Sequence, residues 1–257
     1  MITLTTDFGL KDPYIAEMKG VIYSINPKAT VVDLSHLIDK YNVQMAAFIL
    51  ASAAPYFSKY TIHLAIVDPG VGTARRALAV QTKQAFFVGP DNGILMLAAQ
   101  AQGIQHIYVL TNPKYMLPKV SSTFHGRDIF APAAAHLDKG VKLKEFGAEI
   151  ADPIIPKYAI VEHKNGSLFG VVLHVDGFGN IITNISEGEI SQTNAVKVKL
   201  HHFSLQLVIA KTYSEAKSQE PLALIGSHGF FELALNQGNF SERYRVNPGD
   251  RLEVIIT

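Results

Sequence analysis

The chain has 257 residues and a mass of 28.1 kDa, which suits one large or two small domains. Hydrophobic residues make up 48% of it and charged residues 18%, which allows a sizeable core and argues against intrinsic disorder. The formal net charge of +1 offers no basic excess of the kind that binds nucleic acid or an anionic membrane. Cysteine is absent, which excludes disulfides, thiolate catalysis and cysteine-ligated metals.

The first residues, MITLTTDFG, lack the basic and apolar regions of a signal peptide. The most apolar window, 45–54, is about half as long as a membrane-spanning helix. We therefore expect a soluble, cytoplasmic protein with neither a membrane nor a nucleic-acid partner.

Strand and helix signals alternate along the first half of the chain. Short β-branched and apolar runs predict strands at 1–5, 30–34, 62–67, 77–80, 85–88 and 107–110. Apolar spacing or alanine content predicts helices at 13–25, 42–54, 93–102 and 126–137. Asp12 is the expected cap of the first helix, and Pro55 is the expected stop of the second. This alternation predicts an N-terminal α/β domain with a mostly parallel central sheet covered on both faces.

The pattern changes near 152–156, where two prolines in five residues indicate a linker. Beyond it, strands are predicted at 159–162, 170–175, 196–200, 205–209, 222–225 and 252–256, with no strong helix pattern. The expected domains are 1–152, which is α/β, and 153–257, a smaller antiparallel β-barrel-like domain.

Polar clusters lie where predicted strands end, which is where ligands bind in open α/β sheets. In the segment 7–12, Asp7 can chelate two vicinal hydroxyls such as those of a ribose, although a plain turn and helix cap is the alternative. In the loop 68–76, Asp68 and Arg75 can point into one cleft, or can form an ion pair that only braces the loop. In the segment 123–128, His125 precedes a helix, where it can face a pocket or be structural.

The second half adds polar clusters at 176–180 and 226–232, each of which can also be turn chemistry. A phosphate-binding P-loop, a GxGxxG dinucleotide motif and an HExxH zinc motif are all absent from the sequence. We therefore expect no metal site.

Taken together, these clusters resemble a known family, the S-adenosyl-L-methionine (SAM) hydrolases or hydroxide adenosyltransferases, relatives of bacterial fluorinase and chlorinase. Six segments carry the resemblance, in family order and over essentially the whole chain: TTDFGLKDPY (5–14), VDPGVGTARR (67–76), GPDNG (89–93), TFHGRD (123–128), DGFGNIITNI (176–185) and GSHGFFELALNQGN (226–239). The resemblance implies an α/β domain followed by a β-barrel-like domain. It also implies a homotrimer whose substrate lies between one C-terminal domain and a neighbouring subunit's N-terminal domain.

The resemblance also implies a role for each matching residue. Asp68, Arg75 and His125 match the set associated with hydrolysis, and Asp7 matches the ligand of the ribose hydroxyls. The other implied substrate contacts fall into three groups: Asp12, Tyr14 and Ser227 at the methionine part, Asp176 and Asn180 in a substrate-contact motif, and, at the adenine end, Glu232, the backbone near Leu235 and Gln237, and Tyr213, which the resemblance implies stacks on adenine.

Three positions separate the hydrolases from the halogenases. In halogenases a Tyr occupies the position of Asp68, another Tyr that of His125, and a halide-binding Ser that of Gly126. This chain therefore resembles the hydrolase branch. One departure is His228, which stands where halogenases carry Arg and bears on the contact with the methionine carboxylate.

The implied reaction is in-line attack of water or hydroxide at the ribose C5′, giving adenosine and L-methionine. The leaving group is a neutral thioether and needs no general acid, so activation and placement of water limit the rate. Asp68 and His125 can accept the water proton, and Arg75 can orient Asp68. SAM is then the substrate, and no cofactor or metal is expected. The alternatives are a SAM-dependent halogenase, a non-catalytic protein that binds adenosine or SAM, and a generic α/β scaffold whose clusters are turns.

Overall fold

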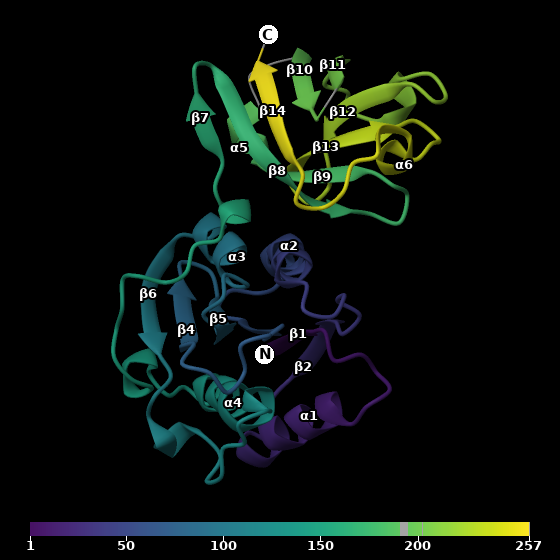
Figure 1. The fold of residues 1–257 in the computed structure, drawn as a ribbon. Helices are drawn as coiled ribbons and strands as arrows, with labels where there is room; N and C mark the ends of the chain where they lie inside the picture. The colour runs from purple at the N-terminus through teal and green to yellow at the C-terminus, as the bar shows by residue number, and fades with distance from the viewer. Residues whose placement is uncertain (191–194, 202, 257) are drawn as a thin grey trace. The chain divides into compact units, whose positions relative to one another are not determined.

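A computed structural model describes residues 1–190, 195–201 and 203–256. The chain forms two compact units, Met1–Pro156 and Lys157–Thr257 (Figure 1). The boundary expected after residue 152 lies a few residues before this division. Within the described ranges, no helix has both the length and the apolar character needed to cross a membrane.

The first unit is built on a six-stranded sheet. Its strands, in spatial order, are β2 (Val31–Ser35), β1 (Ile2–Thr6), β3 (Ile62–Ile66), β5 (Phe86–Pro90), β4 (Ala77–Thr82) and β6 (Ile104–Val109). The first four pair in parallel, whereas β4 is antiparallel to both of its neighbours. The loop between β4 and β5 is too short for a parallel crossover, so these strands form a hairpin. The predicted mostly parallel sheet is confirmed.

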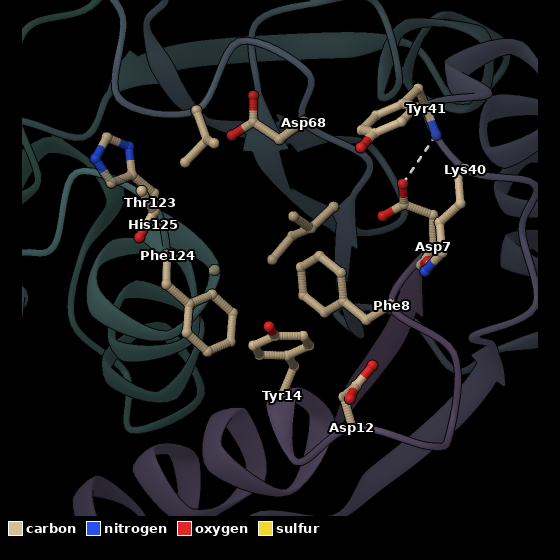
Figure 2. Close-up of a pocket in the computed structure, with 13 residues that line it drawn as sticks. Asp7, Phe8, Asp12, Tyr14, Lys40, Tyr41, Asp68, Thr123, Phe124 and His125 are labelled. Carbon is tan, nitrogen blue, oxygen red and sulfur yellow. Dashed lines mark hydrogen bonds between the residues drawn. The ribbon is translucent and has the colours of Figure 1, made fainter.

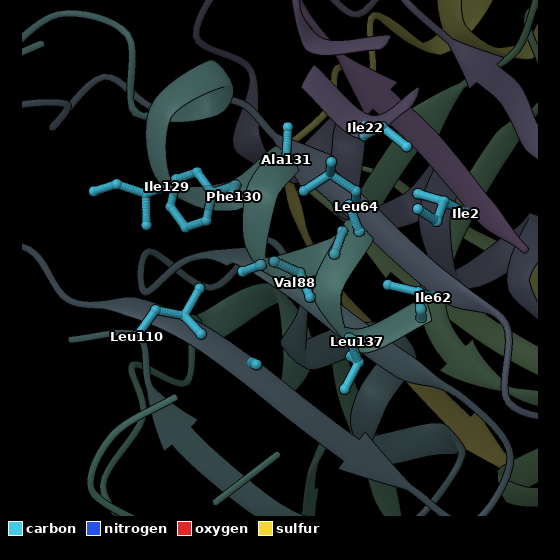
Figure 3. Packing of buried hydrophobic residues seen from close by; sticks show 14 of the residues in the cluster. Ile2, Ile22, Ile62, Leu64, Val88, Leu110, Ile129, Phe130, Ala131 and Leu137 are labelled. Carbon is cyan, nitrogen blue, oxygen red and sulfur yellow. The ribbon is translucent and has the colours of Figure 1, made fainter. Parts of the chain in front are cut away.

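Helices cover both faces of this sheet (Figure 1). The helices are α1 (Tyr14–Ile25) and α4 (Ala131–Asp138) on one face and α2 (Val43–Ala53) and α3 (Met96–Ala101) on the other. Each face has its own apolar cluster: one contains Leu4, Met18 and Phe130 (part of it in Figure 3), and the other contains Leu50 and Phe87. Short 3₁₀ helices span Ala54–Tyr56, Pro113–Tyr115 and Leu143–Glu145.

Asn42 caps α2, and its side chain accepts a hydrogen bond from Met45 N at 2.9 Å. Three other helix ends differ from the prediction. Asp12 does not cap α1, because Pro13 holds the cap position and contributes no side-chain hydrogen bond. The helix predicted at 126–137 begins with a π-helical turn, Gly126–Phe130, and α3 is shorter than the predicted 93–102.

The predicted linker is anchored to the first unit by a buried carboxylate. Asp91 accepts hydrogen bonds from Arg76 Nε at 2.7 Å and from Ile154 N at 2.9 Å, and it is 3% exposed. Arg76 also donates to Asp152 Oδ1 at 2.8 Å. Pro156 packs on Gly93, where a Cβ would approach the proline ring to 2.7 Å. These contacts explain why residues 152–156 belong to the first unit.

The second unit is an antiparallel sheet that almost closes on itself. Its strands are β7 (Glu162–Lys164), β8 (Ser167–Val175), β9 (Ile181–Ser186), β10 (Ala195–Leu200), β11 (Phe203–Val208), β12 (Pro221–Ile225), β13 (Phe230–Leu235) and β14 (Arg251–Ile256). They run in the order β11-β10-β14-β8-β9-β13-β12, with β7 on β8, and a bridge between Ile209 and Ala223 joins the two ends. The predicted β-barrel-like fold is confirmed, with Val172, Phe231 and Val254 fully buried in its core.

Some elements of this unit differ from the prediction. The strand predicted at 159–162 is wrong: a 3₁₀ helix spans Lys157–Ala159 and β7 begins at Glu162. The strands β9 and β13 were not predicted. β9 directly follows the polar cluster 176–180, and β13 begins inside the cluster 226–232, each of which had been interpreted as possible turn chemistry. The short helices α5 (Glu187–Ile190) and α6 (Phe240–Tyr244) and the 3₁₀ turn Tyr213–Glu215 leave no apolar periodicity in the sequence.

Candidate active site

A cavity of about 390 Å³ lies in the first unit, beyond the carboxyl ends of the adjacent parallel strands β1 and β3 (Figure 2). Five residues predicted from the sequence line it: Asp7, Asp12, Tyr14, Asp68 and His125. The remaining lining residues include Phe8, Lys40, Tyr41, Thr123 and Phe124, which the sequence reasoning did not single out. The predicted polar ends of two strands therefore meet at one cavity.

Asp7 is held at this wall by the segment after β2. It is 6% exposed, and its Oδ2 accepts a hydrogen bond from Tyr41 N at 2.9 Å. Lys40 Nζ donates to the Asp7 backbone carbonyl. Tyr41 has a φ of 65°, which is uncommon for a residue other than glycine. The carboxylate thus has a fixed orientation before any ligand arrives.

Asp68, Arg75 and His125 form one hydrogen-bonded group. Arg75 Nε lies 2.9 and 3.0 Å from the two Asp68 carboxylate oxygens, and its Nη2 donates to Asp68 Oδ2 as well. The same Nη2 lies 2.9 Å from His125 Nδ1. The Asp68 side chain is 6% exposed and that of Arg75 is 11% exposed, and the guanidinium packs on the Phe130 ring. The Asp68–Arg75 ion pair therefore braces the loop 68–76, and Arg75 also contacts His125.

The contact with Arg75 decides which nitrogen of His125 carries a proton. A guanidinium can only donate hydrogen bonds, so Nδ1 must accept and the neutral ring carries its hydrogen on Nε2. Burial lowers the pKa of His125, and the Arg75 charge lowers it further, although Asp68 and Asp128 oppose the shift. The histidine is therefore a neutral Nε2–H donor around neutral pH.

Three aromatic rings meet edge to face beside the cavity. The ring centroids are 5.8 Å apart for Phe8 and Tyr14, 5.7 Å for Phe8 and Phe124, and 5.2 Å for Tyr14 and Phe124 (Figure 2). Gly126 packs against the Phe124 ring: an added Cβ would lie 3.2 Å from Phe124 Cε2 and 3.3 Å from Ile66 Cδ1. A larger residue at position 126 must displace these neighbours.

Arg127 and Asp128 stabilise the turn that carries His125. Arg127 Nε donates to Asp128 Oδ1 at 2.7 Å, and Nη1 donates to Glu17 Oε2 of α1 at 2.8 Å. Asp128 is fully buried and also accepts a bond from Ser121 N at 2.7 Å. These two residues therefore pair with each other and tie the turn to α1.

The second unit carries a separate cavity of about 520 Å³. Its lining includes the predicted residues Asp176, Asn180, Tyr213, Leu235 and Gln237, together with Phe178 and Gly238. Asp176 orders the 176–180 loop, because its Oδ1 accepts from Phe178 N and Asn180 N, both at 2.9 Å, and its Oδ2 accepts from Asn180 Nδ2 at 3.0 Å.

Two predicted contacts, Ser227 and Glu232, lie outside the lining of both cavities. Ser227 is in the turn between β12 and β13. Glu232 is on β13 and only 3% exposed, and its two oxygens are engaged by Tyr213 and His228. Among the described residues, no group of three or more histidine and acidic side chains is placed to hold a metal ion.

The fold and the sites define a protein with a mostly parallel α/β unit, which carries an Asp–Arg–His group, and an antiparallel barrel-like unit with its own polar cavity. The chain belongs to the SAM hydroxide adenosyltransferase family: the model of the family's N-terminal domain matches residues 2–147 and that of its C-terminal domain matches residues 170–253.

Full-length relatives agree with this assignment. The chain is 36% identical to an (R)-S-adenosyl-L-methionine hydrolase of Salinispora arenicola, over 98% of this chain and 97% of the relative. It is 26% identical to a fluorinase of an Actinoplanes species, over 100% of this chain and 97% of the relative. A crystal structure of an uncharacterized conserved protein from Thermotoga maritima superposes with a TM-score of 0.88 at 36% identity, covering 99% of this chain and 100% of that one.

Proposed function

We propose that this protein hydrolyses S-adenosyl-L-methionine to adenosine and L-methionine by in-line attack of water at the ribose C5′. The observation that carries the proposal is the Asp68–Arg75–His125 group beside a cavity that also presents Asp7. Full-length relatives named as SAM hydrolases support it at 36% and 37% identity.

The bond changes set what the site must do. A bond forms between the water oxygen and C5′ while the C5′–S bond breaks, and its electron pair stays on the sulfur of methionine. The sulfonium charge disappears and one water proton must leave. Because the leaving group needs no proton, the site has to hold water in line and accept that proton.

The hydrogen-bond directions divide these tasks. Asp68 accepts the proton, and Arg75 holds both of its oxygens in place. His125 does not act as the base at Nε2, because its Nδ1 accepts from Arg75 and Nε2 already carries a hydrogen. Nε2–H donates to the water oxygen. Water bound in this way accepts one bond, donates one to Asp68 and keeps a lone pair for C5′.

The remaining residues bind the substrate in this proposal. Asp7 accepts the ribose hydroxyls, and its prior fixation by Tyr41 lowers the cost of ordering it. Asp12, Tyr14 and Ser227 contact the methionine part, and the second-unit cavity takes the adenine end. The active form is a homotrimer with sites shared between subunits, a prediction that light scattering of the purified protein tests. The cytoplasmic location also stays a prediction.

The first experiment is to incubate the protein with SAM in halide-free buffer containing a chelator and to separate the products chromatographically. We expect adenosine and methionine in equal amounts. Asp68→Asn and His125→Ala should each reduce kcat at least about tenfold, since proton transfer contributes roughly 10²–10⁴-fold. The exposed Tyr56→Phe serves as the unchanged control.

Other outcomes select the alternatives. Bound adenosine without turnover would indicate a binding protein, and chloride-dependent 5′-chloro-5′-deoxyadenosine would indicate a halogenase. Normal turnover in both variants would refute the roles given to Asp68 and His125. Loss of activity with chelator, restored by a divalent ion, would contradict the metal-free reaction.

A further inference from the structure

The side chain of Glu232 is buried at the back of the second-unit cavity and makes two hydrogen bonds. Its Oε1 accepts from the Tyr213 hydroxyl at 2.7 Å, and its Oε2 lies 3.2 Å from His228 Nε2. Tyr213 lines the cavity, whereas Glu232 is 3% exposed and lies outside that lining. The carboxylate therefore contacts the cavity through another side chain.

The hydrogen bonds of His228 show which nitrogen of its neutral ring faces Glu232 as a donor. Phe230 N donates to His228 Nδ1 at 3.2 Å, so Nδ1 accepts and Nε2 carries the hydrogen of the neutral ring. Nε2–H then points at Glu232 Oε2. Both carboxylate oxygens thus receive a donor, as a buried carboxylate requires. His228, which stands where halogenases carry Arg, is directed here to Glu232.

Tyr213 is held at both ends. Its backbone begins a 3₁₀ turn closed by a capping box between Thr212 and Glu215, and its hydroxyl is fixed by Glu232. Burial and the bond to Glu232 raise the pKa of Tyr213, so the hydroxyl stays a donor. The residue is nevertheless 42% exposed and lines the cavity. Its ring is therefore ordered in advance and available to a ligand.

We propose that Glu232 is a positioning residue, not a direct ligand: with His228 behind it, it fixes the Tyr213 ring as the platform on which the adenine base stacks. The proposal rests on the proposed function, because it takes adenosine as the occupant of this cavity. It changes the role that resemblance implies for Glu232, which is contact with the adenine end. A planar, uncharged base is the chemistry that a fixed aromatic ring recognises.

The test is a double-mutant cycle on adenosine binding, measured by calorimetry with the full-length protein. Tyr213→Phe removes the hydroxyl and keeps the ring. Glu232→Gln keeps the side-chain volume but leaves one acceptor oxygen for two donors. Each change should weaken adenosine binding about three- to tenfold, the cost of ordering one more side chain on binding. The double variant should bind no more weakly than Tyr213→Phe alone, because Glu232 acts through that hydroxyl.

The outcomes are distinct. If the two effects multiply, Glu232 contacts the ligand independently and the proposal is wrong. If binding is unchanged in both variants while thermal stability falls, the cluster is only structural. If wild-type protein and the control Tyr56→Phe both fail to bind adenosine, the proposed function itself fails. Tyr213→Phe keeps the ring but leaves one oxygen of the buried Glu232 without its donor, so thermal unfolding of each variant is measured beside its adenosine binding.

Discussion

His63, a fully buried histidine of β3, should make the first unit lose stability in mild acid. Its Nδ1 lies 2.8 Å from Thr3 Oγ1, and its ring stacks on Phe87 with a centroid distance of 5.1 Å. Its Nε2 has no hydrogen-bond partner among the described residues. Burial lowers the pKa of His63 to about 4, from 6.5 for a free histidine. A charged imidazolium thus has nowhere to place its second N–H.

The size and sign of the effect follow from proton linkage. The unfolded chain binds the proton below pH 6.5, while the folded chain resists it down to about pH 4. The free energy of unfolding therefore falls as pH drops through this window, by about 2 kcal/mol at pH 5 and about 3 kcal/mol below pH 4. Above about pH 7.5 the histidine is neutral in both states and contributes no pH dependence.

Hydrogen exchange of peptides from β1 and β3 measures the opening free energy of this unit at pH 7.5 and pH 5, after correction for intrinsic exchange rates. His63→Gln removes the titration but keeps a polar partner for Thr3. We expect wild type to lose about 2 kcal/mol more than His63→Gln between these pH values. The exposed His163→Gln should follow wild type. Parallel pH profiles for wild type and His63→Gln would refute the reasoning.

Three further predictions concern the active site and one helix end. Protonated His125 would direct a hydrogen at Arg75, and the pKa of His125 is lowered. We therefore expect kcat/KM for SAM hydrolysis to fall only below about pH 6.5. A loss of kcat/KM that begins above that pH would contradict this prediction. Gly126→Ser should lower turnover and reduce the free energy of unfolding by about 1–3 kcal/mol, because the added Cβ crowds Phe124. Formation of 5′-chloro-5′-deoxyadenosine by this variant in chloride would show instead that one serine supplies a halide site. Asn42→Ala should lower the free energy of unfolding by about 1 kcal/mol in urea titrations followed by circular dichroism, and an unchanged midpoint would show that the α2 cap is unimportant.

Patterns of apolar residues predicted most of this fold, because their local spacing indicates where strands end and which faces are buried. Asp7 and Asp68 were each predicted to follow a strand, and the parallel pairing of β1 with β3 brings them to one cavity. Lys40 and Tyr41 were missed because the loop after β2 has no pattern that points back to Asp7. The π-helical turn at Gly126–Phe130 was missed as well, since such turns are rare and this helix was predicted from its alanine content.

Residue types in a motif were predictable, but their chemical roles were not. The sequence placed His125 near Asp68 and Arg75, and left both His125 and Asp68 able to accept a proton. In the structure a donor-only guanidinium meets Nδ1, so the neutral histidine carries its hydrogen on Nε2, and this contact is the basis on which we propose Asp68 as the base. The role of a residue in proton transfer depends on which of its atoms contacts which atom of its neighbour. The spacing of residues in the sequence does not indicate the side-chain rotamers that decide this.

Glu232 is a second residue whose role the sequence alone could not predict. The resemblance implied that Glu232 contacts the adenine end directly, yet its two oxygens accept hydrogen bonds from Tyr213 and His228 inside the protein. A motif position can matter for binding by touching the ligand or by holding the residue that does, and the sequence is the same in both cases. Comparing Tyr213→Phe, Glu232→Gln and the double variant separates them, because only a residue that acts through Tyr213 loses its effect when the hydroxyl is gone.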